Sequence, residues 1–179
     1  APIRPHAPLP TSAAALEQAA VVPGSGRLPI APTPLIGRAA VVADALALLR
    51  QRDSRLLTLA GPGGAGKTRL ALALAHAVEQ QFADGVAIVP LAPVRDPTQV
   101  LATIAAALGL GERDERSPLM RLQDALRKRE MLLVLDNFEH LLAAASDIAQ
   151  LLAAALGLKI LLTSRALLRI AGEQAYSVP

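Results

Sequence analysis

The chain contains no cysteine and no tryptophan, and its 179 residues include only two phenylalanines and one tyrosine. Without cysteine, a disulfide framework, a zinc knuckle and thiol chemistry are all excluded, which fits a reducing compartment. Proteins that bind single-stranded nucleic acid stack bases on aromatic side chains. Because the only aromatic residues are Phe82, Phe138 and Tyr176, the sequence argues against that class of protein.

The chain also lacks a charged N-terminal region followed by an apolar run, the pattern of a signal peptide. Its most apolar stretch, residues 141–158, contains Ser146, Asp147 and Gln150, which favours a soluble helix over a membrane span. The net charge of +3 comes from dispersed arginines rather than a basic stripe, so nucleic-acid binding by these residues is only weakly indicated. We therefore expect a cytoplasmic protein without membrane contact.

Proline is concentrated at one end: eight of the 14 prolines lie within residues 1–34. Proline fixes φ and removes a backbone donor, so we expect residues 1–33 to be a Pro/Ala-rich linker, largely extended or disordered. A short helix capped by Thr11 or Ser12 could interrupt it. Residues 34–179 have the size of one α/β domain. The linker, and a strand that begins in the last five residues, predict a segment of a longer chain.

Helix and strand patterns alternate from residue 35 onward. Asp96-Pro97 and Ser117-Pro118 each place a capping oxygen before a proline, which marks a helix start, and Gly109 is a helix stop. Apolar strands separated by helices predict a mainly parallel sheet covered on both faces. The predicted helices include residues 39–52, 67–82 and 140–156, and the predicted strands are 55–60, 86–92, 131–136 and 158–165.

Residues 61–68, GPGGAGKT, fit the phosphate-loop pattern GxxxxGK[ST] between a predicted strand and a predicted helix. Glycines let backbone amides surround phosphates, and the helix start offers further free amides. Lys67 would reach the β- and γ-phosphates, and the Thr68 hydroxyl would bind Mg²⁺. The chain has 15 arginines and only three lysines; a compact ammonium fits inside such a loop, whereas a planar guanidinium does not. The competing interpretation is a glycine-rich turn with an incidental lysine.

Asp136 ends the apolar strand MLLVLD, at the sheet edge where α/β proteins bind ligands. There it could hold Mg²⁺ opposite Thr68, or simply cap the following helix. The neighbouring Asn137 can orient water but cannot accept its proton. Glu139 is a candidate general base, or else an acid in the first turn of a helix, and His140 is expected to cap or pack.

A third apolar strand ends in Thr163, Ser164 and Arg165. Hydroxyls and a guanidinium at this edge could sense the γ-phosphate, because arginine suits bidentate phosphate contacts. The alternative is an ordinary solvated charge beyond a strand. Beside the phosphate loop and Asp136, we favour the sensor role.

Together these stretches resemble the nucleotide-binding domain of bacterial STAND-class regulatory ATPases, an NB-ARC and AAA-like family found in large LuxR-type, winged-helix or cyclase-linked transcriptional regulators. The similar stretches are PLIGR, LLTLAGPGGAGKTRLALALA, LLVLDNFEHL, ILLTSR and LLRIAGEQAYSVP. The resemblance implies a P-loop NTPase three-layer sandwich of about five strands. It also implies that the Arg165 strand lies between the phosphate-loop strand and the Asp136 strand.

The resemblance also implies site roles, with residues 35–38 forming an element that lies over the adenine of ATP or ADP. The expected nucleotide-binding residues are Ile36, Gly37, Arg38, Gly61, Gly63, Gly64, Ala65, Gly66, Lys67, Thr68 and Arg69. The expected catalytic residues are Lys67, Asp136, Glu139 and Arg165, and the expected Mg²⁺ ligands are Thr68 and Asp136.

Two departures from the family pattern bear on activity. Ala39 stands where the family usually has glutamate, and Asn137 stands where eukaryotic relatives have a proposed catalytic acid. We therefore expect weak ATPase activity in the full-length protein. The helical and winged-helix subdomains of the family are missing from these residues, so DNA contact is expected only through domains outside them.

The favoured function is a nucleotide switch in the control of transcription, in which the ATP form self-associates and slow Mg²⁺-dependent hydrolysis reverses it. A turnover ATPase or a small-molecule kinase is the first alternative, although it would need an acceptor pocket or a strong catalytic acid. A scaffold that binds ATP or ADP without hydrolysis is the second, and Asn137 favours it.

Overall fold

The structure is a computed structural model that describes residue 28, residues 37–111 and residues 115–179. Five parallel strands form one sheet in the order β2-β3-β4-β1-β5. The strands are β1 (Leu56–Ala60), β2 (Val86–Pro90), β3 (Met131–Asp136), β4 (Leu158–Ser164) and β5 (Glu173–Ser177). The expected P-loop NTPase sheet is confirmed, including the position of the Arg165 strand, β4, between β1 and β3.

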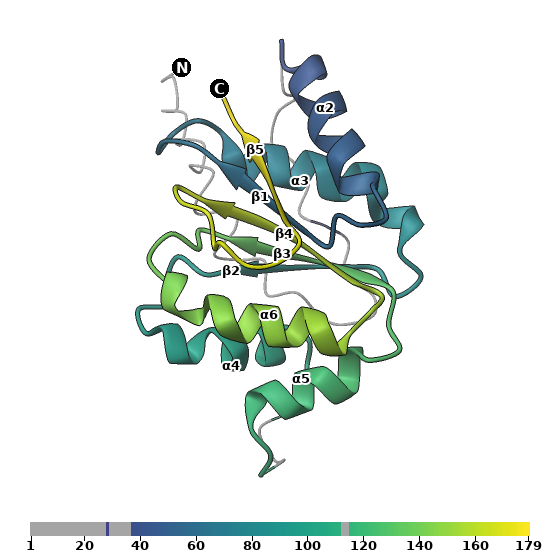
Figure 1. Cartoon of the computed structure of the whole chain (residues 1–179), viewed down its shortest axis with the longest axis vertical. Coiled ribbons are helices and arrows are strands. Elements are labelled where there is room, and N and C mark those ends of the chain that lie inside the picture. Colours follow the sequence, from purple (N-terminus) through teal and green to yellow (C-terminus); the bar gives the residue numbers. More distant parts are fainter. Residues whose placement is uncertain (1–27, 29–36, 112–114) are drawn as a thin grey trace, which may run out of the picture.

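Helices cover both faces of this sheet, which makes three layers (Figure 1). On one face lie α2 (Ala39–Arg50) and α3 (Lys67–Val78), and on the other lie α4 (Val100–Ala107), α5 (Pro118–Leu126) and α6 (Ala145–Ala154). Short 3₁₀ turns connect them: η1 (Glu79–Gln81), η2 (Pro97–Gln99) and η3 (Leu142–Ala144). Each βαβ crossover returns the chain to the same edge, so all strands end on one side of the molecule.

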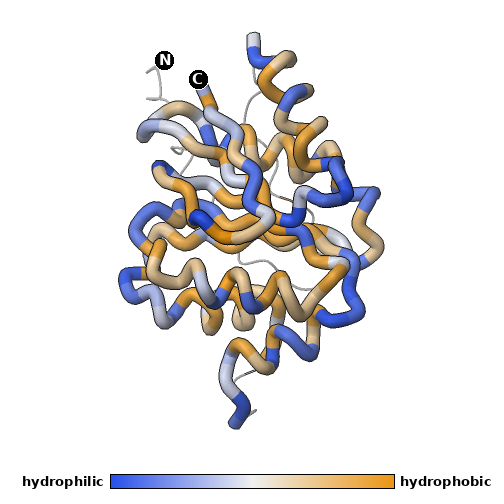
Figure 2. The backbone as a smooth tube through the Cα atoms, viewed as in Figure 1, coloured by the Kyte–Doolittle hydropathy of each residue, from blue (hydrophilic) through white to orange (hydrophobic). Residues whose placement is uncertain are grey.

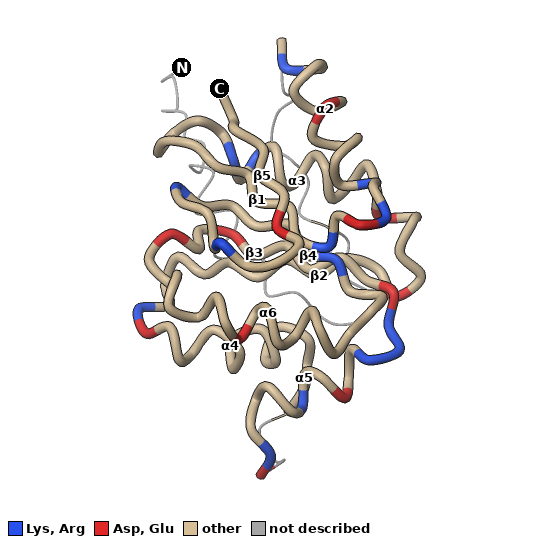
Figure 3. Tube along the Cα trace, viewed as in Figure 1, with Lys and Arg blue, Asp and Glu red and all other residues tan. Residues whose placement is uncertain are grey.

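Apolar residues follow the strands through the centre of the molecule (Figure 2), and charged residues lie at strand ends and in the connecting segments (Figure 3). The dispersal of arginine expected from the sequence therefore persists in the fold. Among the described residues, no helix is long and apolar enough to cross a membrane.

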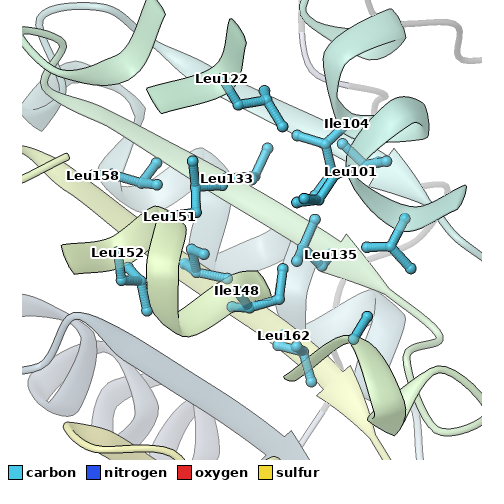
Figure 4. Packing of buried hydrophobic residues seen from close by; sticks show 14 of the residues in the cluster. Leu101, Ile104, Leu122, Leu133, Leu135, Ile148, Leu151, Leu152, Leu158 and Leu162 are labelled. Atoms are coloured by element: carbon cyan, nitrogen blue, oxygen red, sulfur yellow. The ribbon is translucent and has the colours of Figure 1, made fainter. Parts of the chain in front are cut away.

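Alternation along the central strands divides the core into two clusters. In β3, Met131, Leu133 and Leu135 pack toward α4, α5 and α6, whereas Leu132 and Val134 pack toward α2 and α3. Figure 4 shows the first of these clusters, in which helix residues such as Ile104, Leu122 and Ile148 meet the sheet. Strands buried on both faces are apolar at nearly every position, as the sequence predicts.

The helix boundaries agree with their capping signals. The Asp96 carboxylate accepts a hydrogen bond from the Thr98 amide at 2.9 Å, and the Ser117 hydroxyl accepts one from the Met120 amide at 3.3 Å. Gly109 stops α4 with φ at +68°, in the left-handed region that favours glycine.

Several predicted elements have different limits in the structure. The helix predicted for 67–82 ends at Val78 and continues as η1, and the helix predicted for 140–156 begins as η3 and becomes α-helical only at Ala145. The final strand begins at Glu173, two residues earlier than predicted. Helix ends are set by tertiary packing as much as by local sequence, so such shifts are ordinary.

Most of the predicted linker, including the helix expected at Thr11 or Ser12, lies outside the described residues. Leu28 is described, and it is only 4% exposed. It belongs to the apolar cluster of α2 and α3, with Leu49 and Leu70 among its members.

Candidate nucleotide-binding site

The predicted phosphate loop, residues 61–66, joins β1 to α3 at the carboxyl edge of the sheet. Gly64 and Gly66 have φ of +81° and +85°, which side chains with a Cβ rarely adopt. Gly66 caps α3 without any side-chain hydrogen bond. The amides of the first helical turn have no intrahelical partners, so this helix start can bind an anion.

Lys67 bends back over this loop. Its ammonium donates hydrogen bonds to the carbonyls of Gly61 at 2.8 Å and Pro62 at 2.9 Å. The side chain thus remains inside the arc formed by the loop, where a compact ammonium fits better than a guanidinium.

Arg38 brings the segment before α2 to the same loop. Its Nη1 donates to the Ala65 carbonyl at 2.6 Å, and Nη1 lies 3.4 Å from where a Cβ on Gly66 would be. Gly37 adjoins it with φ at +74°. Ile36 lies outside the described residues, so its contact with adenine stays a prediction, and Arg69 lies half-buried in the first turn of α3.

Thr68 and Asp136, the predicted Mg²⁺ ligands, are in direct contact. The Thr68 hydroxyl donates to Asp136 Oδ1 at 2.8 Å, and Asp136 is 8% exposed. Mg²⁺ is commonly held by one or two protein oxygens together with substrate phosphates. A hydroxyl and a carboxylate fit that requirement, and no cluster of three or more His, Cys, Asp or Glu occurs within the described part of the chain as an alternative metal site.

Thr163 completes this network from β4. Its hydroxyl donates to Asp136 Oδ1 at 2.6 Å and accepts a hydrogen bond from the Asn137 amide at 2.8 Å. Asn137 has φ at +69°, and asparagine tolerates this region better than most residues. Thr163 therefore holds the acid and the turn that follows it.

The structure reduces the three predicted sensor residues at the end of β4 to one. The idea that hydroxyls there face a phosphate is wrong for both residues: Thr163 and Ser164 are 1% and 0% exposed. The Ser164 hydroxyl accepts a hydrogen bond from the Ala166 amide at 3.1 Å. Arg165 is thus the only one of the three whose side chain reaches the surface, at 65% exposed.

Glu139 and Arg165 form an ion pair, with Arg165 Nε 3.2 Å from Glu139 Oε1. The same guanidinium lies over the phosphate loop, because its Nη2 is 3.2 Å from where a Cβ on Gly63 would be. Arg165 thus contacts Glu139 and lies beside the loop that precedes Lys67, while Asp136 contacts Thr68, the residue after Lys67. His140 is exposed and makes a hydrogen bond with the Val94 carbonyl, which lies 2.6 Å from its Nε2.

Sequence reasoning missed Glu173, which organises the loop between β4 and β5. Its carboxylate accepts hydrogen bonds from the Thr58 hydroxyl at 2.6 Å and from the amides of Leu168 at 3.0 Å and Arg169 at 2.6 Å. Thr58 is fully buried on β1, and nothing in the linear pattern connects it to a residue 115 positions away.

A second group of cations lies at the opposite edge of the sheet, beside a cavity of about 470 Å³ whose lining includes Arg52, Arg55 and Lys159. Lys159 donates to the carbonyls of Leu49 and Gln51 at the end of α2. Burial, and secondarily the charge of Arg55, lowers the pKa of Lys159. This lysine caps a helix, so it plays a structural role.

A model of the AAA domain family matches residues 50–171. The chain belongs to the AAA domain family. The match includes the phosphate loop, Asp136, Glu139 and Arg165, whereas Gly37, Arg38 and Glu173 lie outside it.

Several relatives of this AAA domain are regulators by name. It is 47% identical over 134 residues to a Mycobacterium tuberculosis protein named "Putative HTH-type transcriptional regulator Rv0890c", covering 74% of this chain and 15% of that protein. It is 32% identical over 172 residues to "Regulatory protein AfsR" of Streptomyces coelicolor, covering 86% of this chain and 17% of that protein. The chain thus spans about a sixth of the length of these regulators.

Solved structures support the fold of this AAA domain. Cdc6p from Pyrobaculum aerophilum matches with a TM-score of 0.58 at 21% identity, over 76% of this chain and 41% of that chain. A STAND protein with a tetratricopeptide repeat sensor from Pyrococcus horikoshii matches with a TM-score of 0.51 at 16% identity, over 76% and 22% of the two chains. At these identities the likeness concerns the fold alone. It confirms the expected AAA-like P-loop fold.

Proposed function

We propose that this domain is an ATP/ADP-binding switch in a signal-transducing regulatory ATPase that controls transcription in the cytoplasm. The observation that supports it most directly is the contact between Thr68 and Asp136 beside the Lys67 loop. That arrangement suits a magnesium–nucleotide complex, and the names of the relatives favour a regulatory role.

Each residue has a distinct task in this proposal. The loop amides and Lys67 bind the phosphates, and Thr68 and Asp136 hold Mg²⁺. When bound, Mg²⁺ neutralises charge on the phosphate oxygens. Residues 36–38 and Arg69 contribute to nucleotide binding from the two segments that flank the loop.

Arg165 and Glu139 distinguish and process the γ-phosphate. Arg165 makes a contact that ADP cannot provide, so ATP and ADP favour different arrangements of the site. Glu139 takes the proton of the attacking water, and Asn137 orients that water. Hydrolysis is slow because Asn137, the residue beside the Mg²⁺ acid, cannot accept a proton.

The remaining parts of the switch involve other regions of the protein. We propose that the ATP form of the full-length protein self-associates and that DNA is contacted only through domains outside these 179 residues. The second candidate is a scaffold that binds nucleotide without hydrolysis. The asparagine beside Asp136 favours it, since a strong acid would otherwise be expected there.

Isothermal titration of nucleotide-stripped protein with ATP and with ADP, each with Mg²⁺, tests the proposal. We expect dissociation constants in the micromolar range, equivalent to about 8 kcal/mol, and loss of binding in Lys67→Ala. Lys128→Ala is the matched control, because Lys128 is exposed just after α5, away from the loop. Equal binding by wild type and Lys67→Ala would contradict the proposal.

Substituting Glu139 separates the switch from the scaffold. If Glu139→Gln abolishes slow phosphate release while ATP still binds, Glu139 is the base. No phosphate release from the wild type, with tight binding retained, would favour the scaffold instead.

A further inference from the structure

The ion pair between Glu139 and Arg165 joins the two residues to which the proposed function gives separate tasks. Glu139 follows β3 and Arg165 follows β4, which are neighbouring parallel strands, so both lie at the same edge (Figure 1). The Glu139 side chain is 20% exposed, and its buried Oε2 has no hydrogen-bond partner among the described residues. The carboxylate therefore has one ligand, Arg165, where it could accept several.

Arg165 spans the gap between this carboxylate and the phosphate loop. Its Nε contacts Glu139, and its Nη2 lies over Gly63. The guanidinium is thus shared between an acid and the loop expected to hold phosphates. A phosphate bound bidentately uses two neighbouring donors of a guanidinium. A phosphate at Gly63 that used both Nη2 and Nε would therefore displace the Glu139 carboxylate from Nε.

We propose that Glu139 determines nucleotide specificity by competing with the γ-phosphate for Arg165. The inference rests on the proposed function, since it requires nucleotide in the loop. In the ADP form Arg165 stays with Glu139. In the ATP form Arg165 moves to the γ-phosphate, which releases the carboxylate for water. The pair weakens ATP binding relative to ADP binding and frees the base only when there is a γ-phosphate to cleave.

The exposure of Arg165 makes this exchange feasible. Ion pairs with one well-exposed partner contribute little and break readily, whereas arginine and phosphate form strong charge-assisted bonds. Loss of the competing pair should tighten ATP binding by about two- to fivefold, which is the range expected for an exposed pair.

Two other roles are possible for these residues, and each would change nucleotide affinity differently. The ion pair could serve only to stabilise the two loops, or the Glu139 carboxylate could serve only to repel phosphates. If the pair only fixes the two loops, its loss would affect stability but not the ratio of ATP to ADP affinity. If Glu139 only repels phosphates, its neutralisation would tighten ATP binding whether or not Arg165 is present. A double-mutant cycle separates both roles from competition for Arg165.

The experiment titrates the chain with a non-hydrolysable ATP analogue and with ADP, each with Mg²⁺. The variants are Glu139→Gln, Arg165→Met and the double variant. Glu130→Gln is the matched control, because Glu130 is an exposed acid that precedes β3 at the opposite edge. We expect Glu139→Gln to bind the analogue about two- to fivefold more tightly with ADP unchanged. We expect no such gain in the Arg165→Met background.

The inference is overturned if Glu139→Gln leaves the affinity ratio unchanged, or if its gain persists in Arg165→Met. The proposed function survives either result, provided that the wild type binds nucleotide and Lys67→Ala does not. If the wild type binds neither nucleotide, both fail together. Thermal unfolding of each variant confirms that it is folded, and Glu139→Gln keeps the shape of the side chain it replaces.

Discussion

Removing the Thr163 hydroxyl should destabilise the domain more than an ordinary surface change. Thr163 is 1% exposed and makes two hydrogen bonds through one oxygen: it donates to Asp136 at 2.6 Å and accepts from the Asn137 amide at 2.8 Å. Valine has the same shape and fits the β4 backbone. Thr163→Val therefore removes the two hydrogen bonds with little change in packing.

The expected loss of stability follows from the two groups that lose a partner, the Asp136 carboxylate and the Asn137 amide. A hydrogen bond to a charged group contributes about 1.5–3 kcal/mol, and a buried amide without a partner costs about 1–3 kcal/mol. Burial of the new methyl group returns about 1 kcal/mol. We therefore expect the free energy of unfolding to fall by about 3 kcal/mol, which lowers Tm by about 6–12 °C in a domain of this size.

Urea denaturation followed by circular dichroism gives the free energy of unfolding, and Tm comes from a thermal scan. Thr163→Ser is the control, since it keeps the hydroxyl and should lose much less stability. A loss below about 1 kcal/mol in Thr163→Val would refute the reasoning. It would mean that the Asn137 amide finds water instead.

Two further predictions concern stability away from the site. Gly157→Ala should lower the free energy of unfolding by about 1–3 kcal/mol, because its Cβ would collide with the Arg129 carbonyl oxygen. Gly111→Ala is the urea-denaturation control, since its Cβ would meet no atom of the described residues within 4 Å, and equal losses would contradict the geometry. Hydrogen bonds from Thr98, first from its backbone and then from its side chain, lower the pKa of Asp96. The charged carboxylate therefore stabilises the fold at pH values above the ordinary aspartate pKa, and this contribution disappears as the pH falls through the lowered pKa. The stability difference between wild type and Asp96→Asn should therefore shrink in acid, and a pH-independent difference would count against the cap.

Several parts of the fold were predictable because their signals are local. Gly109, Asp96 and Ser117 mark helix ends through the conformation or hydrogen bond of one or two residues. The apolar strands were predictable because a strand buried on both faces is apolar at nearly every position. Helix length was less accessible, since packing against the sheet decides where α3 gives way to η1.

At the site, the sequence predicted which residues matter better than what each one touches. Lys67, Thr68 and Asp136 follow from a motif and a strand end. Thr163 was assigned to the γ-phosphate, although its hydroxyl is turned inward to Asp136. Successive side chains at a strand end point to opposite faces of the sheet. The sequence pattern alone therefore did not show which of these side chains faces the ligand.

The sequence by itself determined the phosphate loop, the parallel α/β architecture and the set of polar residues at the strand ends. Each depends on spacing within one segment: glycines at fixed offsets, apolar runs of strand length, and capping residues before prolines. Only the tertiary structure decided the pairing of Arg165 with Glu139, of Thr163 with Asp136 and of Glu173 with Thr58. These pairs join segments 26 to 115 residues apart. The first two contacts exist because parallel strands align their ends at a common edge, and the third exists because β5 pairs with β1.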